Sequence, residues 1–292
     1  MEVRSFGLGS TTVFDVPLLT EYVYWRFTTT GVKGDTIKND ISGINTMLTF
    51  LGHGINLQNN NSAPLIRLYR GCNRLRVQHG IGTKAFYRRA LVDKMLDPMV
   101  RSLKGSSHWV RTVRAMLLFA KHTAFRPMNY VRTSVPEALC CVKHVTFIPS
   151  ISNPRNVIVT LPQTKTHQID ARFKETRTVQ CRCVKGPCPV HELAKLLQDR
   201  RAEPEEALFL LANGFPVTYY RLKKIMQLLC QGFDLEWQYY TPYCLRIGEA
   251  TDRNMRGESL ERTMKFVNWK SRKSAMTYIR PDNEDFVKFP DV

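Results

Sequence analysis

The spacing of apolar residues predicts helices in the first part of the chain. Asp15 is a typical N-cap residue, and the apolar run after it repeats every three or four positions until Gly31: Leu19, Tyr22, Val23 and Phe27. A second run with this spacing lies between Asp35 and Gly52 and carries Ile37, Ile41, Ile44, Leu48 and Leu51. Residues 67–103 hold two or three further helical segments. We therefore expect a small helical bundle before the break KGSSH at 104–108.

After this break the apolar spacing becomes strand-like and then helical again. The β-branched runs VKHVTFI (142–148) and NVIVTL (156–161) flank the turn-like PSISNPR, which predicts a hairpin. TRTVQCRCV (176–184) is a candidate third strand. Helical stripes return at Val190, Leu193, Leu196 and Leu197, at Leu222, Ile225, Met226 and Leu229, and at Leu260, Met264 and Val267. The expected fold class is mainly α with a small β-sheet (α+β).

Composition narrows the kind of protein that these elements build. Hydrophobic residues make up 43% of the 292, enough for real cores, and no apolar run reaches the roughly 18 residues that a membrane span needs. The first residues, MEVRSFGLGS, do not resemble a signal peptide. Eight cysteines in a chain of this length are typical of reduced thiols inside a cell rather than of a disulfide scaffold. We therefore expect an intracellular protein with no membrane partner.

The charge indicates a polyanionic partner, most simply nucleic acid. The formal net charge is +18, and residues 67–114 hold twelve lysines and arginines against two aspartates. Such a one-sign stretch is typical of phosphate contacts, although a solvated basic face is the alternative. The candidate DNA-binding residues are Arg67, Arg70, Arg74, Arg76, Lys84, Arg88, Arg89 and Arg111.

Later motifs supply the parts needed to cut a phosphodiester without metal or water. That reaction needs a nucleophile, cations that hold the non-bridging oxygens, and an acid for the departing 5′ oxygen. HTAFRPMNYV contains Arg126, LPQTKTHQ contains Lys165 near the end of the second strand, and TPYCLRIGEAT contains Arg246. VNWKSRKSAMTYIRP then places Trp269 nine residues before Tyr278. Arginine suits the phosphate because its fork meets two oxygens at once.

In this order the motifs resemble the signature of the tyrosine recombinases, a family that includes Cre recombinase and the phage integrases. The signature runs Arg, hairpin Lys, His-x-x-Arg, His or Trp, and Tyr, and the resemblance covers most of the chain. The segments YCLRIGEAT, NWKSRKSAMTYIRP and CPVHEL are similar in sequence to segments of recombinases from eukaryotic mobile elements of the DIRS and crypton types. The resemblance implies a helical core-binding domain at 1–104 and a catalytic domain at 105–292, which together clamp DNA.

The resemblance also implies roles for the matching residues. Arg126 and Arg246 would grip the scissile phosphate, and Lys165 would protonate the leaving oxygen. Trp269 would pack against the phosphate, and Tyr278 would form a 3′-phosphotyrosyl link. The expected partners are double-stranded DNA and further copies of the chain in a tetramer, with no cofactor, on DNA inside the cell and in the nucleus of a eukaryotic host. A further hypothesis is that Phe286, Val287 and Phe289 of the C-terminal tail dock in a neighbouring subunit.

Two positions depart from the family pattern. Tyr243 replaces the histidine of His-x-x-Arg, and a phenol is a poor proton shuttle near neutral pH. Asn129 stands where the family usually has an acidic residue, three positions after Arg126. These changes keep a second interpretation open, a domesticated DNA-binding protein that has lost catalysis. A type IB topoisomerase, which shares the chemistry but relaxes DNA, is the nearest enzymatic alternative, and a metal-dependent nuclease is disfavoured because no acidic motif accompanies the basic region.

Each candidate residue also has an ordinary structural interpretation. Tyr278 and Trp269 could be packed aromatics, Arg126 could bind helix-end carbonyls, and Lys165 has Lys174 and Lys185 as nearby competitors. Four residues could ligate zinc in the pattern C-x-C-x4-C-x2-H, namely Cys181, Cys183, Cys188 and His191. This spacing is not that of a common zinc finger, so the sequence favours plain thiols and no metal.

Overall fold

The computed structural model describes residues 16–30, 32, 34–50, 52, 63–78, 88–161 and 175–289 of the chain. Its contacts divide the chain into two compact units, Met1–Phe86 and Tyr87–Val292. The sequence suggested a division after residue 104 instead. Residues 93–102 form a helix whose buried side chains belong to the core of the second unit, so this helix is part of that unit.

The first unit contains three described helices, as the apolar spacing predicted: α1 (Val16–Thr30), α2 (Gly34–Phe50) and α3 (Ala63–Gln78). Their core consists of Leu19, Val23, Ile37, Ile41, Leu65, Tyr69 and Cys72. The second helix begins at Gly34, one residue before the expected cap at Asp35. The Gly34 backbone N–H donates to the side-chain oxygen of Asn73 at 3.1 Å, which ties the start of α2 to α3.

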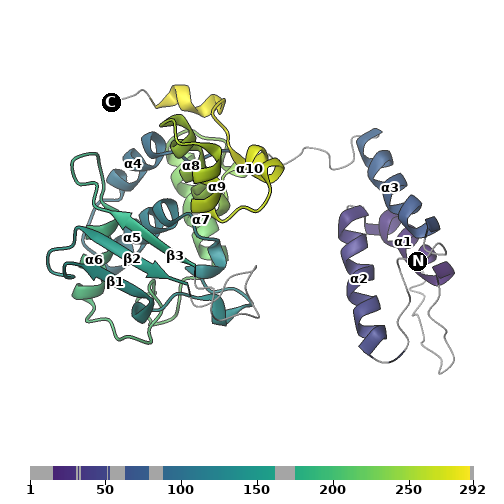
Figure 1. The fold of residues 1–292 in the computed structure, drawn as a ribbon, viewed down its shortest axis with the longest axis horizontal. Helices are drawn as coiled ribbons and strands as arrows, with labels where there is room; N and C mark the ends of the chain where they lie inside the picture. Colours follow the sequence, from purple (N-terminus) through teal and green to yellow (C-terminus); the bar gives the residue numbers. More distant parts are fainter. Residues whose placement is uncertain are drawn as a thin grey trace. The chain divides into compact units, whose positions relative to one another are not determined.

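The second unit is mostly helical and contains a small sheet (Figure 1). Its described α-helices are α4 (Asp93–Ser102), α5 (His108–Thr123), α6 (Pro189–Asp199), α7 (Tyr219–Gly232), α8 (Tyr243–Met255), α9 (Leu260–Val267) and α10 (Arg272–Tyr278). Its strands are β1 (Val145–Ile148), β2 (Asn156–Thr160) and β3 (Thr176–Gln180). Short 3-10 helices are η2 (Pro127–Asn129), η3 (Pro136–Ala138), η4 (Val142–His144), η5 (Trp237–Tyr239) and η6 (Glu284–Lys288). The expected fold class, mainly α with a small sheet, is confirmed.

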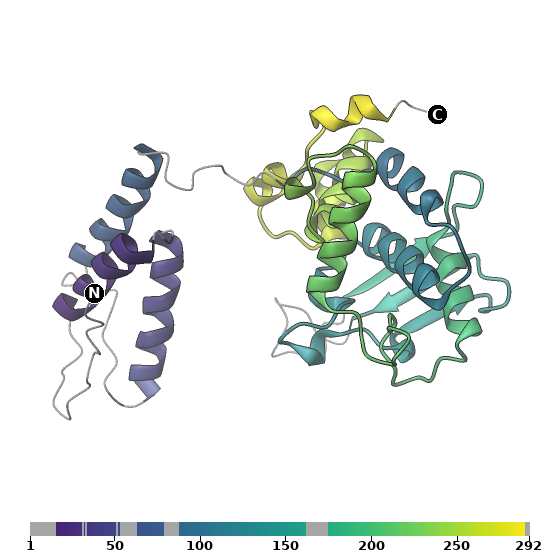
Figure 2. The same cartoon turned by 180° about the vertical axis from the view of Figure 1, so that it is seen from behind.

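The strands form an antiparallel sheet in the order β1-β2-β3, which confirms the hairpin and the third strand. Alternate residues of β2 and β3 point into the core, among them Val157, Val159 and Val179, as the two-residue period of a strand requires. Helices α5 and α6 pack together against one face of this sheet, as the two opposite views show (Figure 1, Figure 2).

Helix α8 passes through the middle of the second unit and is buried over most of its length. It approaches the segment before α4 so closely that a Cβ on Gly248 would lie 1.9 Å from the Leu91 carbonyl oxygen, so a glycine is required there. Backbone N–H groups of Arg89 and Leu91 donate to Tyr239 (3.2 Å) and Cys244 (3.1 Å). These contacts bring residues 88–92 alongside the start of α8.

A buried ion cluster joins α4, α5 and α8. Lys121 is fully buried, and its ammonium contacts Asp93 at 2.8 Å, Glu249 at 3.0 Å and Asp252 at 2.6 Å. A buried ammonium without carboxylate partners would be very costly, so these three acids are what allows Lys121 to lie in the core.

The C-terminal tail packs against its own unit. Phe286 and Phe289 are 8% and 6% exposed in the main core, and Phe289 stacks on Phe233 with ring centroids 5.9 Å apart. The Asp285 carboxylate accepts hydrogen bonds from Arg89 and the Tyr240 hydroxyl, both at 2.6 Å. Phe286 and Phe289 are thus buried in their own unit, whereas Val287 is 86% exposed, and docking of this tail in a neighbouring subunit stays a prediction. No helix among the described residues is long and apolar enough to cross a membrane.

Candidate active site

Most of the described residues that the sequence singled out for chemistry meet in one cleft of the second unit. The cleft has a volume of about 500 Å³, and its lining includes Arg88, Arg126, Tyr243, Arg246, Trp269 and Tyr278. These side chains come from the segment before α4, the end of α5, the start of α8, the link after α9, and α10. Lys165 lies outside the described residues. Its described competitor Lys185 lines a different cavity, beside the cysteines that follow β3.

The end of α5 positions Arg126. Helix α5 stops at Ala124, which has a left-handed backbone (φ 50°), and Arg126 then follows in an extended conformation as the N-cap of η2. Asn129, three residues later, is buried, and its side-chain amide donates to the Ala138 carbonyl at 3.1 Å. Asn129 therefore anchors the loop that carries Arg126 but brings no negative charge to the arginine.

Helix α8 presents Arg246 from inside the protein. Its side chain is almost fully buried, and its guanidinium donates to the backbone carbonyls of Ala124 and Val267, at the ends of α5 and α9. Burial, and then repulsion from Arg126, lower the pKa of Arg246 to about 9. The guanidinium remains charged at neutral pH, and an anion in the cleft would offset both unfavourable effects. The cleft is therefore electrostatically suited to a phosphate.

Tyr243 lies one helical turn before Arg246, on the same side of α8. The guanidinium of Arg88 lies over the Tyr243 ring, 4.6 Å from its centroid. The sequence had assigned Arg88 to general DNA binding, whereas the structure places it in the cleft wall. No local sequence signal marks this position, because it depends on the pairing of residues 88–92 with α8.

Trp269 and Tyr278 lie face to face. Asn268 ends α9 with a left-handed backbone (φ 55°), and Trp269 follows it directly. The rings of Trp269 and Tyr278 are stacked with centroids 5.4 Å apart and an interplanar angle of 20°. The Arg246 guanidinium is 5.8 Å from the centroid of the Trp269 ring. Trp269 therefore links the arginine to the tyrosine, as the nine-residue spacing had suggested only indirectly.

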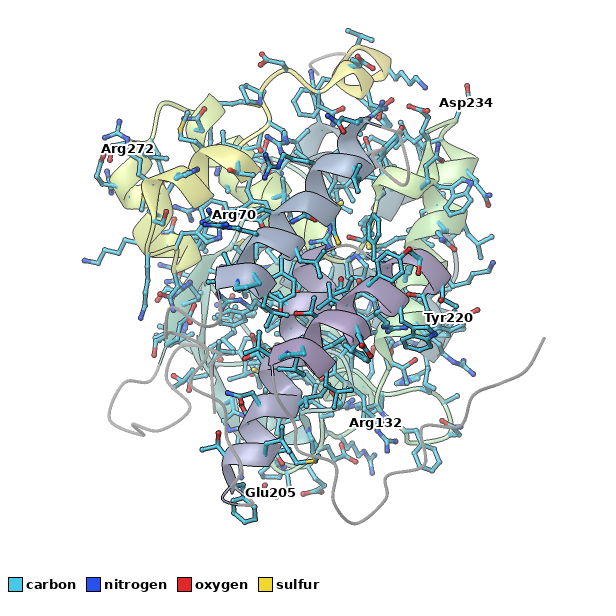
Figure 3. The ribbon with its side chains drawn as sticks, turned by 90° about the vertical axis from the view of Figure 1, so that its right-hand side faces the viewer. Arg70, Arg132, Glu205, Tyr220, Asp234 and Arg272 are labelled. Atoms are coloured by element: carbon cyan, nitrogen blue, oxygen red, sulfur yellow. The ribbon has the colours of Figure 1, made fainter. Side chains whose placement is uncertain are left out.

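The tyrosine is held by its helix and yet remains accessible. Ala275, on the inner side of α10, and Ile279, directly after the helix, are 0% and 8% exposed, whereas Tyr278 is 36% exposed. Ile279 packs with Ala124, Ala250 and Val267. Figure 3 shows Arg272, at the start of α10, on the outside of the unit, where it faces solvent. The helix thus buries its apolar side and leaves the tyrosine ring at the cleft.

One acidic residue next to the cleft escaped the sequence analysis. Glu175, just before β3, is 9% exposed; its carboxylate accepts from the Asn268 side-chain amide at 2.7 Å and forms an ion pair with Arg177. Its negative charge opposes the lowering of the pKa of Arg246. Glu175 thus supplies the anionic neighbour that Asn129 does not. Its proximity to α8 and α9 arises only from the fold.

The remaining candidate DNA-binding residues are placed less uniformly. Arg67, Arg70 and Arg74 are exposed on α3, where Figure 3 labels Arg70. The Arg76 side chain and Lys84 lie outside the part of the chain that the structure describes. Arg89 and Arg111 are engaged by carboxylates, Arg89 by Asp285 and Glu236 and Arg111 by Asp199. A phosphate would have to compete with these acids.

The four candidate zinc ligands also come together. The donor atoms of Cys181, Cys183, Cys188 and His191 all lie within 4.8 Å of one another. They lie in the connection between β3 and α6 and in the first turn of α6, and none of them lines the cleft that contains Tyr278.

Solved structures share this fold, although no family model and no curated protein sequence matches the chain. The XerH site-specific recombinase bound to palindromic difH substrate, in a post-cleavage complex, matches with a TM-score of 0.58 and 14% identity, over 94% of this chain and 71% of that chain. The Tn1549 transposon integrase in complex with transposon right-end DNA matches with a TM-score of 0.55 and 14% identity, over 93% and 83% of the two chains. At this identity the likeness establishes the fold, and the chain therefore has the fold of tyrosine recombinases and integrases.

Proposed function

We propose that this protein is a site-specific DNA recombinase or integrase that cleaves and rejoins DNA through a 3′-phosphotyrosyl intermediate. The observation that carries the proposal is the convergence of Tyr278, Trp269, Arg246 and Arg126 in one cleft from four separate parts of the fold. A core aromatic or a helix-end arginine would not require this meeting. The fold shared with DNA-bound recombinases and the net charge of +18 support the same conclusion.

The proposed reaction needs only the protein, the DNA and solvent water. The Tyr278 phenol oxygen attacks phosphorus and passes its proton to water, which reaches this partly exposed side chain, while Arg126 and Arg246 hold the non-bridging oxygens. The bond from phosphorus to the 5′ oxygen breaks, and that oxygen takes a proton from an acid, the role proposed for Lys165. Attack by the 5′ hydroxyl of a second strand reverses these steps and releases the tyrosine. Trp269 holds the Tyr278 ring by stacking, and the tyrosine side chain is still 36% exposed.

The biological setting follows from the same proposal. Recombination between two sites needs paired DNA segments, so we expect a tetramer of this chain on double-stranded DNA. The protein would act on DNA inside the cell, in the nucleus if the host is a eukaryote, and a mobile element is the expected source of its sites. No cofactor enters the proposed strand transfer.

A covalent trapping experiment tests the nucleophile. Suicide duplexes with a nick and a randomised core are incubated with protein and separated under denaturing conditions, where only a covalent adduct stays with the DNA. We expect an adduct with wild type, none with Tyr278→Phe, and an unchanged adduct with Tyr220→Phe, which alters an exposed tyrosine on α7. An adduct that persists in Tyr278→Phe would show that another residue is the nucleophile.

Two departures from the family pattern, Tyr243 in the cleft and Asn129 buried behind it, favour a second candidate function. Tyr243 stands where the family has a histidine, and Asn129 carries no charge, so the chain could be a DNA-binding protein without strand cleavage. Tight binding of the suicide duplexes by wild type with no adduct would establish this alternative. If the adduct forms, a supercoiled plasmid with two copies of the selected sequence separates the remaining possibilities, because a topoisomerase yields relaxed circles and a recombinase yields exchanged segments.

A further inference from the structure

The cluster formed by Cys181, Cys183, Cys188 and His191 has the geometry of a metal site. Sulfur–sulfur distances are 3.4 Å from Cys181 to Cys183 and 3.7 Å from Cys181 to Cys188. The His191 Nδ1 atom is 3.6 Å from the sulfur of Cys181 and 3.3 Å from each of the other two. Zinc bonds of about 2.3 Å to sulfur and 2.0 Å to nitrogen in a tetrahedron place the ligand atoms about 3.5–3.8 Å apart. The observed separations are close to this spacing.

The backbone brings these four residues together by simple rules. Cys181 directly follows β3, and its N–H donates to the Arg155 carbonyl at 2.8 Å, so the extended pairing continues past the strand. Cys183 lies in the turn that follows, and its sulfur lies 3.4 Å from that of Cys181, so both side chains point to the same side. Cys188 is the N-cap of α6 and His191 is three residues further on, so both face the same end of that helix.

The loop between the ligands is adapted to this arrangement. Arg182 points to the other side, where its guanidinium contacts Asp93 at 3.1 Å and Asp97 at 3.0 Å. Its backbone N–H donates to the Cys188 sulfur at 3.4 Å, a contact that favours a thiolate there. The turn that follows packs so tightly that a Cβ on Gly186 would lie 2.4 Å from the Asp97 carboxylate.

Thiol chemistry alone does not explain the cluster. All eight cysteines lie among the described residues, and none forms a disulfide. A disulfide would join two sulfurs and leave the third, whereas here the imidazole nitrogen lies near three sulfurs at once. Thiols are weak donors and weak acceptors, so hydrogen bonds alone give little reason for three to converge on one nitrogen. A cation bound at the centre of the four donor atoms explains this convergence.

A second cluster in the same unit shows the contrast. Asp93, His122 and Glu249 also lie close enough to share an ion, but the Lys121 ammonium already contacts both acids, at 2.8 and 3.0 Å. The Lys121 ammonium is therefore already the cation that neutralises that cluster. Among the ion pairs and hydrogen bonds of the described residues, no side-chain nitrogen of a lysine or arginine is paired with the cysteine–histidine cluster.

We infer that Cys181, Cys183, Cys188 and His191 bind one structural zinc ion that fastens the end of β3 to the start of α6. Three thiolates and an imidazole form a soft donor set that selects zinc over magnesium or calcium. All four tetrahedral positions are filled by protein, so the site is closed and takes no part in the proposed strand transfer. Its role is to fix the sheet against α6, and it stands whether or not the protein cleaves DNA.

The test is metal content and its dependence on the ligands. Full-length protein is purified in reductant without chelator, and its metal content is measured by inductively coupled plasma mass spectrometry. It should contain about one zinc per chain, the number that one tetrahedral site implies. Cys183→Ser, at the exposed cysteine ligand, should lose most of this zinc, whereas Cys141→Ser, at a half-buried cysteine elsewhere, should keep it. A zinc chelator should lower the melting temperature of wild type and of Cys141→Ser, but not of Cys183→Ser.

Cobalt gives a readout that does not depend on the stability of a variant. Wild type stripped of metal and titrated with Co²⁺ should develop the visible bands of tetrahedral thiolate-bound cobalt, saturating at about one ion per chain. Zinc should then abolish these bands. Wild type with no zinc and no cobalt bands would overturn the inference, and so would full zinc content in both Cys183→Ser and His191→Ala.

Discussion

At the scale of single residues, the carboxylate of Glu175, which the family signature does not contain, offsets the repulsion among the arginines around the cleft. Arg126, Arg177 and Arg246 repel one another, and Glu175 is the acid that the described structure places among them. Burial lowers the pKa of Arg177, while the charge of Glu175 opposes this shift. A carboxylate in this position reduces the cost of bringing these arginines together in the cleft without a bound anion.

Glu175→Gln should therefore destabilise the second unit. The Glu175 and Arg177 side chains are only 6% and 9% exposed, and removal of one partner from a buried pair costs about 3 kcal/mol. Urea denaturation at neutral pH measures this loss, and added inorganic phosphate should restore more stability to the variant than to wild type. Glu258→Gln is the matched control, because its pair with Arg253 is more exposed, with Glu258 at 28%. Equal, small losses in both variants would show that Glu175 does not balance the arginines.

At the scale of elements, the Lys121 cluster holds α4, α5 and α8 in the register that the cleft needs. Burial opposes the ionisation of Glu249, but the charges of Lys121 and His122 outweigh it and lower its pKa to about 2. The pKa of Asp93 is lowered for related reasons, whereas burial raises that of Asp252. A lowered carboxyl pKa contributes stability that is present above the ordinary value and is lost as the pH falls through the lowered value.

Lys121→Met should cost about 3–5 kcal/mol at neutral pH, because it leaves buried carboxylates without their cation. The difference from wild type should shrink as the pH falls from about 4.5 towards 2, because wild type loses the stabilisation of Glu249 as this carboxylate becomes protonated. Urea titrations at several pH values measure this trend. Lys143→Met, which breaks an exposed pair with Glu205, should change little at any pH. A penalty that does not depend on pH would indicate lost packing rather than lost charge pairing.

The sequence predicted the helices and strands more fully than the contacts between them. Periodicity predicted α1, α2 and the hairpin because a helix or strand turns its apolar face inward at every repeat. Trp269 and Tyr278 could be assigned to one site in advance because their motif resembles the family signature. Glu175 and Arg88 could not, since each reaches the cleft through contacts far away in sequence. For the same reason the sequence could not establish that Cys181, Cys183, Cys188 and His191 come together, or that Phe286 and Phe289 pack in the core of their own unit.

At the scale of the whole molecule, positive charge is spread over both units, but its availability differs. Arg67, Arg70 and Arg74 are exposed on α3 in the first unit, spaced so that they share one side of the helix. In the second unit Arg89, Arg111 and Arg114 are paired with carboxylates. If DNA binding follows the availability of the guanidinium groups rather than their number, α3 should contribute more to phosphate binding than the paired arginines do.

The salt dependence of DNA binding measures this difference. Each phosphate contact adds about 0.9 to the slope of log affinity against log salt concentration, so replacement of Arg67, Arg70 and Arg74 by alanine should reduce the slope by about 3 if all three make contacts. Replacement of Arg111 and Arg114 by alanine should change it by much less, since those side chains already have anionic partners. The same fixed duplex serves all three proteins, because the slope reports phosphate contacts and not base sequence. An unchanged slope in the α3 variant would mean that the first unit does not hold the DNA backbone through this helix, and that the charge excess of residues 67–114 acts elsewhere.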